Sequence, residues 1–149
     1  LLTALLPILR GRFLASEIPL MCHLGEGHWL AGENDKARQT LEEALKITER
    51  CGARYYSAFA QRILGEIALK TNPAQAVPHF EKSIAVFREI KAENELALAF
   101  AGYGRCYKLK GQIAQAREYL TKALEIFERL GTLIEPDKVR KELTGLPEA

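Results

Sequence analysis

Three side chains of the kinds that bind metals lie close together in the sequence, at Cys22, His23 and His28. Thiolate and imidazole groups are preferred zinc ligands, and a structural zinc site is closed by four ligands. Residues one and five apart do not share a helix face, and the third or fourth ligand is missing. We therefore predict that these side chains pack and that the chain holds no metal.

No set of residues predicts catalysis. The sequence lacks a Ser, His and Asp constellation and a pair of carboxylates in apolar surroundings. Gly102, Gly104 and Gly111 do not form a phosphate loop, because no Lys-Ser or Lys-Thr follows them and no strand precedes them. We expect these glycines to make helix contacts and a turn. The sequence predicts a protein that is not an enzyme and needs no cofactor.

Single polar residues on the predicted helices are expected at the surface. His79 is alone on its helix and should be solvated. Glu42 with Lys46 and Glu118 with Lys122 are four apart, so they are predicted to form helix-surface ion pairs worth a few tenths of a kcal/mol.

The composition excludes several function classes. The 149 residues carry 21 basic and 19 acidic side chains, for a formal net charge of +2, so no strong field favours nucleic acid or membrane lipid. No apolar run reaches the roughly 18 residues that a membrane span needs. Cys22, Cys51 and Cys106 are an odd number without a CxxC pair, which is typical of reduced thiols. We predict a cytoplasmic protein without nucleic-acid or membrane partners.

The elements that position these residues repeat along the chain. Gly25, Gly65 and Gly104 are 40 and 39 residues apart. Each glycine is followed by a small, a large and a second small residue: Ala37, Leu41 and Ala44, then Ala76, Phe80 and Ser83, then Ala116, Leu120 and Ala123. A period of this length indicates stacked helical units. Small residues allow helices to approach closely, and we expect the large residues to fill the space between them.

The fold class predicted from this period is all-α, with no strand signal. The predicted units are a remnant helix at 1–10, repeats at 16–52, 53–91 and 93–131, and a capping helix at 135–144. Ser16 is expected to cap the first helix of the first repeat, with Pro19 in its first turn.

Glycines and prolines indicate how the helices end. Gly52 and Gly131 supply a left-handed stop fifteen residues past the alanine of their repeats. The second repeat has Lys91 in that position, so we expect its turn to close by a different route. Asn72 and Pro73 predict a capped helix start after a turn one residue shorter than in the third repeat.

The apolar start of the chain has two interpretations. A signal-peptide core is one, but the stretch has no initiator methionine and no basic residues before it. We favour a helix left from an earlier repeat of a larger protein. Its apolar side chains would then have lost their cover, so we expect homo-oligomers to form through Leu1, Leu2, Leu5, Leu6 and Ile8.

The repeated residues resemble the tetratricopeptide repeat. The third unit matches that motif at Phe100, Tyr103, Gly104, Tyr107, Ala116, Leu120 and Ala123. The first unit matches at Met21, Leu24, Gly25, His28, Ala37, Leu41 and Ala44, and the second at Leu64, Gly65, Ala68, Ala76, Phe80 and Ser83. The second unit departs from the motif at Gln61, where an aromatic is usual, and the period exceeds the usual 34 or so residues. The resemblance implies a right-handed superhelix of antiparallel helix pairs, in the extended form of the repeat.

The resemblance also implies a concave groove lined by the first helix of each unit. The repeat register places these residues there: Glu26, Trp29, Phe59, Arg62, Glu66, Arg105 and Lys108. Such a mixture suits a peptide or helix of a protein partner. Trp29 and Phe59 have the alternative of packing against neighbouring helices. The family's clamp for a peptide carboxylate needs Lys and Asn where this chain has Cys22 and Glu26, which disfavours that function.

The tail, residues 123–138, resembles the carboxyl-terminal repeats of large bacterial signalling proteins that join a nucleotide cyclase or kinase to an ATPase module. We therefore keep two functions open. The leading one is a non-enzymatic interaction module or scaffold. The alternative is an intramolecular module that gates a neighbouring ATPase or cyclase domain of the same chain.

Overall fold

The computed structural model describes the backbone of residues 2–148 and the side chains of residues 16–148. Over this part of the chain the structure is all-α, and it contains no strand. The helices are α1 (Leu2–Leu30), α2 (Asn34–Cys51), α3 (Arg54–Thr71), α4 (Pro73–Glu89), α5 (Glu93–Leu109), α6 (Ile113–Leu130) and α7 (Glu135–Thr144).

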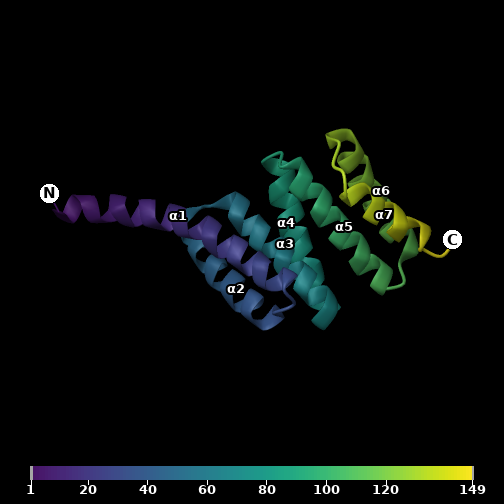
Figure 1. Cartoon of the computed structure of the whole chain (residues 1–149), viewed down its shortest axis with the longest axis horizontal. Coiled ribbons are helices and arrows are strands. Elements are labelled where there is room, and N and C mark those ends of the chain that lie inside the picture. Colours follow the sequence, from purple (N-terminus) through teal and green to yellow (C-terminus); the bar gives the residue numbers. More distant parts are fainter. Residues whose placement is uncertain (1, 149) are drawn as a thin grey trace.

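The helices pack as antiparallel pairs that stack along the chain (Figure 1). α1 pairs with α2, α3 with α4 and α5 with α6, and α7 packs on α6. The first helices of successive pairs also touch, because α1 contacts α3 and α3 contacts α5. The core lies between the pairs, with Phe80, Phe87 and Phe127 among its largest fully buried side chains. The predicted class, an all-α superhelix of stacked helix pairs, is confirmed.

The repeated glycines are the points of closest approach within each pair. Each faces the large residue of its own repeat: Gly25 faces Leu41, Gly65 faces Phe80 and Gly104 faces Leu120. A Cβ atom added to Gly25 would lie 2.6 Å from Leu41 Cγ, closer than real Cβ contacts allow. This close approach explains why the glycine and the large residue recur together, and it confirms the predicted contact between them.

α1 differs from the prediction, because it is one helix from Leu2 to Leu30. The expected break between a remnant helix and a helix capped by Ser16 is wrong. Pro19 lies inside α1, where a proline removes one backbone hydrogen bond. Ile18 and Cys22 are both buried one helical turn apart, so packing against the rest of the chain holds this part of α1 helical. The side chains predicted to drive self-association lie outside the described residues.

The turn after α4 also corrects a prediction. Lys91 adopts a left-handed conformation with φ of 58°, as Gly52 does at 66° and Gly131 at 69°. The Ala92 N–H donates to the Phe87 carbonyl at 3.0 Å. The residues after Gly52 and Gly131 donate the corresponding hydrogen bond to the carbonyl five residues before them. The second repeat therefore closes by the same route, with a lysine in a conformation that favours glycine.

The turn between α3 and α4 is the short one, as predicted. Asn72 alone separates these helices, whereas residues 31–33 and 110–112 separate the other pairs. Pro73 begins α4 as expected, but the Asn72 side chain makes no capping hydrogen bond. Its backbone carbonyl instead accepts a hydrogen bond from the Gln75 N–H at 2.9 Å. No helix among the described residues is long and apolar enough to cross a membrane.

Candidate functional site

Charged side chains form a line across the first helices of the repeats. This charged row consists of Glu26 on α1, Arg62 and Glu66 on α3, Arg105 on α5 and Glu142 on α7. Arg62 Nη2 lies 3.8 Å from Glu26 Oε1, and Arg105 Nη1 lies 3.2 Å from Glu66 Oε1. Arg105 also donates two hydrogen bonds to Glu142, from Nε at 2.9 Å and from Nη2 at 2.8 Å. The row links all four helices through alternating charges.

Burial and pairing together set the electrostatics of this row. Burial raises the pKa of Glu66, although Arg105 and Arg62 act in the opposite direction. Burial acts to lower the pKa of Arg105, but the Glu142 hydrogen bonds and the Glu66 charge outweigh it and the pKa is raised. Arg62 is only 4% exposed, and its Nε has no hydrogen-bond partner among the described residues. A buried guanidinium of this kind depends on the carboxylates on either side of it.

The predicted groove residues divide into two groups. Glu66, Arg105 and Lys108 line a hollow of about 430 Å³ together with Leu69, Lys70, Leu109 and Glu142. The other four, Glu26, Trp29, Phe59 and Arg62, do not line it. Phe59 is buried beneath the Arg62 guanidinium, 5.5 Å from its ring centre, while Trp29 is half-buried.

Sequence reasoning missed part of this hollow. The sequence predicts only a capping helix at 135–144, so it does not place Glu142 in the groove. The repeat spacing carries the signal that places α7, because Val139 lies 40 residues after Ala99 and both are buried. α7 therefore continues the series of first helices, and this series positions Glu142 to reach Arg105.

Two of the cations that line the hollow, Lys70 and Lys108, form no ion pair within residues 16–148. Lys70 and Lys108 have no carboxylate within 4 Å among the described residues. Leu109 lies beside them with 59% of its surface exposed. The arrangement offers two free ammonium groups next to apolar surface, which suits carboxylate and aliphatic side chains of a ligand.

Cys22, one of the three side chains of metal-binding type, is fully buried, as predicted. Burial raises the pKa of both Cys22 and Cys106 to about 11, so both thiols stay protonated at neutral pH. The Cys22 thiol points at the Tyr56 carbonyl, 3.8 Å away. His28 Nδ1 lies 2.5 Å from Glu33 Oε2. Within residues 16–148, no three His, Cys, Asp or Glu side chains group in a way that would hold a metal ion.

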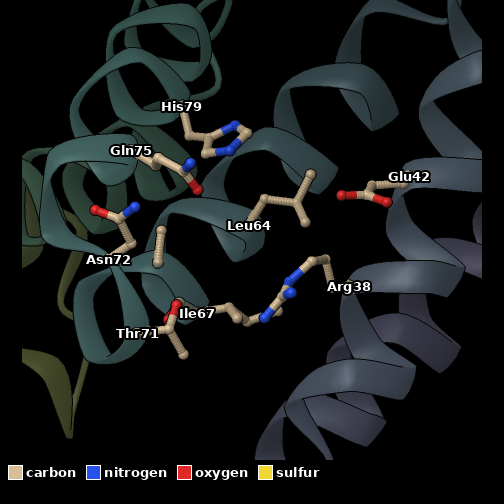
Figure 2. Close-up of a pocket in the computed structure, with 9 residues that line it drawn as sticks. Arg38, Glu42, Leu64, Ile67, Thr71, Asn72, Gln75 and His79 are labelled. Atoms are coloured by element: carbon tan, nitrogen blue, oxygen red, sulfur yellow. The ribbon is translucent and has the colours of Figure 1, made fainter.

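A second hollow, of about 370 Å³, lies between α2, α3 and α4 (Figure 2). Arg38 and Glu42 line it from α2, Leu64 and Ile67 from α3, and Gln75 and His79 from α4. Figure 2 shows Leu64 between the Glu42 carboxylate and the His79 ring. No sequence argument placed a site here.

Two predictions about this hollow are wrong. His79 is half-buried rather than solvated: its Nδ1 lies 2.6 Å from Gln61 Oε1, and burial, with the charge of Lys82, lowers its pKa. Glu42 forms no ion pair with Lys46, and among the described residues its carboxylate makes no hydrogen bond or ion pair, although its charge acts to raise the pKa of His79. The other expected pair, Glu118 Oε1 with Lys122 Nζ, is present at 2.6 Å.

The repeat pattern defines the family. The sequence pattern of the tetratricopeptide repeat matches residues 16–89 and 68–129, which together span well over half of the chain. The chain therefore belongs to the tetratricopeptide repeat family, whose repeats generally mediate interactions between proteins and are typically not enzymes. A search of the curated proteins finds no match to this chain.

Proposed function

We propose that this chain is a non-enzymatic module that binds a peptide or helix of a partner protein on the face that carries the charged row. Trp29 and Lys108 keep surface for direct contact with that partner. The paired members of the row, such as Arg62 and Arg105, hold the face in shape. This separates residues that bind from residues that position the binding surface.

One observation carries the proposal. The arginines of the face pair with carboxylates of the chain itself, whereas Lys70 and Lys108 do not. These lysines flank the exposed Leu109 in the hollow of about 430 Å³. A segment with acidic side chains next to an aliphatic one would complement both features.

A selection from a random peptide library tests the proposal. We expect the chain to enrich segments that combine acidic and aliphatic residues. Lys70→Glu and Lys108→Glu should each weaken the selected peptides by about two- to fivefold, the size expected of exposed ion pairs. Lys46→Glu, an exposed charge reversal on α2, is the matched control and should leave binding unchanged. Selection of the same peptides by the Lys70→Glu, Lys108→Glu double variant would contradict the proposal.

The alternative is a partner within the same polypeptide, so that the repeats gate an ATPase or nucleotide cyclase domain. The contact of Arg105 with Glu142 favours it, because a helix of the chain itself already supplies a carboxylate to this face. Nucleotide turnover by such a protein with and without residues 1–149 tests the idea. Unchanged turnover would reject gating.

The uncovered side of α1 also supports the predicted self-association. Leu20 is 69% exposed and Leu24 is 51% exposed. Ala60 and Ala99, at the positions of Leu20 in the next two repeats, are fully buried. We expect light scattering to detect oligomers at high concentration, and the variant Leu20→Glu, Leu24→Glu to be monomeric. A monomeric wild-type chain would refute this proposal.

A further inference from the structure

The hollow between α2, α3 and α4 has a counterpart one repeat later. We call the place where α2 meets α3 and α4 the first junction, and the place where α4 meets α5 and α6 the second junction. A shift of 39 or 40 residues converts each residue of the first junction into one of the second: Arg38 into Val77, Glu42 into Glu81, Leu64 into Tyr103, Ala68 into Tyr107 and His79 into Tyr119. The two sets occupy the same positions of the repeat.

Tyrosine rings fill the second junction. The ring centre of Tyr119 lies 4.8 Å from that of Tyr103 and 5.5 Å from that of Tyr107, and the Tyr107 and Tyr119 rings are stacked at 6°. The Tyr103 hydroxyl donates to Glu81 Oε1 at 2.8 Å. Lys122 Nζ lies 4.8 Å from the Tyr119 ring centre, so a cation covers the cluster.

The two junctions preserve a contact between their helices. His79 on α4 meets Gln61 on α3, and the corresponding residues of the second junction, Tyr119 on α6 and Phe100 on α5, meet with ring centres 5.8 Å apart. Corresponding side chains therefore meet at both junctions, and the junctions differ in side-chain volume. Leu64 and Ala68 replace two tyrosines and leave a hollow of about 370 Å³, within the range of roughly 300 to 1,000 Å³ typical of ligand sites.

We propose that the hollow of the first junction binds a tyrosine side chain presented by a partner protein. Its ring would lie against Leu64, Ala68 and His79 in the place that the rings of Tyr103 and Tyr107 take in the second junction. Its hydroxyl would donate to the Glu42 carboxylate, as Tyr103 does to Glu81.

The remaining charges of the hollow fit this ligand. Glu42 makes no hydrogen bond or ion pair among the described residues, although its charge acts on the neighbouring His79, so its carboxylate can accept a hydrogen bond. Arg38 takes the position of Val77, and its Nη2 makes only a 3.6 Å pair with Asp35, which is itself almost fully exposed. The Arg38 guanidinium can therefore cover the face of a bound ring. None of the predicted groove residues lines this hollow, so the site is separate from the one proposed above.

An NMR titration of the ¹⁵N-labelled chain with N-acetyl-Gly-Tyr-Gly-amide tests the proposal. We expect saturable shifts of the amide signals of Leu64, Ala68 and His79. The matched peptide N-acetyl-Gly-Phe-Gly-amide should bind about tenfold more weakly, because it lacks the hydroxyl that donates to a charged carboxylate. Glu42→Gln should remove most of this preference for the tyrosine peptide.

Two further variants make the result specific to the hollow. Ala68→Tyr copies Tyr107 and should block the peptide, and if it fails to fold, the exposed substitution Glu42→Gln still decides the question. Glu81→Gln, the same change at the second junction, should leave peptide binding as in the wild type. The proposal is overturned if no saturable shift occurs at the hollow, if the shifts map to Lys70 and Lys108 instead, or if Glu42→Gln binds the tyrosine peptide as tightly as the wild type.

Discussion

The first and second junctions are formed by corresponding helices of successive repeats and have different interiors. At the second junction, three tyrosines contact one another and Tyr103 donates to Glu81. At the first junction, Leu64 and Ala68 stand in two of the same positions and leave a hollow. The difference shows that the repeat signature of glycine and large residue fixes how close the helices come. The residues between these positions decide whether a junction is packed or open to a ligand.

The largest expected effect comes from giving the second junction the residues of the first. Tyr103→Leu with Tyr107→Ala removes two aromatic side chains from the cluster, so the free energy of unfolding should fall by roughly 2 to 5 kcal/mol. Urea unfolding followed by circular dichroism measures the change. A loss below about 0.5 kcal/mol, the size of an ordinary surface substitution, would show that the rings contribute nothing to packing there.

A second test concerns the space that the Phe80 ring occupies next to Gly102. A Cβ added to Gly102 would lie 2.2 Å from Phe80 Cε1, whereas the first junction holds Ile63 and Leu41 at these two positions. Gly102→Ala should therefore cost about 1 to 3 kcal/mol of unfolding free energy, and adding Phe80→Leu should recover part of it.

Gly27→Ala is the matched control for that test, because no atom lies within 4 Å of its added Cβ. Gly27→Ala should raise the free energy of unfolding by about 0.5 to 1 kcal/mol, because alanine loses less conformational freedom than glycine on folding. If the losses of unfolding free energy for Gly102→Ala and Phe80→Leu are strictly additive in a double-mutant cycle, the two residues do not compete for the same space and this account is contradicted.

A third test compares the turns that lead into the junctions. The turn before α3 uses Gly52 and the turn before α5 uses Lys91, both with positive φ. Lys91→Gly should raise the free energy of unfolding by about 0.5 to 1 kcal/mol, because a left-handed conformation is unfavourable for a residue with a side chain. Gly52→Lys should have the opposite sign. Equal stability of Lys91→Gly and the wild type in urea unfolding would argue against this account of the turn.

The smallest expected effect is the pH dependence that His79 contributes at the first junction. Burial, followed by the charge of Lys82, lowers the pKa of His79 below its ordinary value of 6.5 and outweighs the Glu42 carboxylate on α2, which acts to raise it. The unfolded chain then binds this proton at a higher pH than the folded chain, so the free energy of unfolding falls as the pH drops below about 6.5.

His79→Tyr copies the second junction and should reduce that loss. The measurement compares urea unfolding of the two proteins at about pH 8 and about pH 5, on either side of the histidine range. An equal loss in both proteins would assign the pH dependence to other groups.

The features that follow from the repeat period could be predicted from the sequence. The all-α class, the helix pairs and the contacts of Gly25, Gly65 and Gly104 follow from small residues that recur where helices approach. The division into repeats 16–52, 53–91 and 93–131 stays a prediction drawn from that spacing.

Features outside the period could not be predicted in the same way. α1 continues through Pro19 because tertiary packing outweighs one lost hydrogen bond, and Lys91 accepts a positive φ because the turn requires it. Pairing along the charged row depends on side-chain reach between helices, which residue type alone does not give. The hollow of the first junction depends on how far the side chains of Leu64 and Ala68 reach between the helices, where the second junction has Tyr103 and Tyr107.

The most direct test of the equivalence of the two junctions is the stability of one variant, Leu64→Tyr, Ala68→Tyr, His79→Tyr. If the first junction has the same helix placement as the second, the three rings fit the hollow. The free energy of unfolding, measured in urea, should then equal or exceed that of the wild type. A loss of about 1 to 3 kcal/mol, as expected of an overpacked core, would contradict the equivalence.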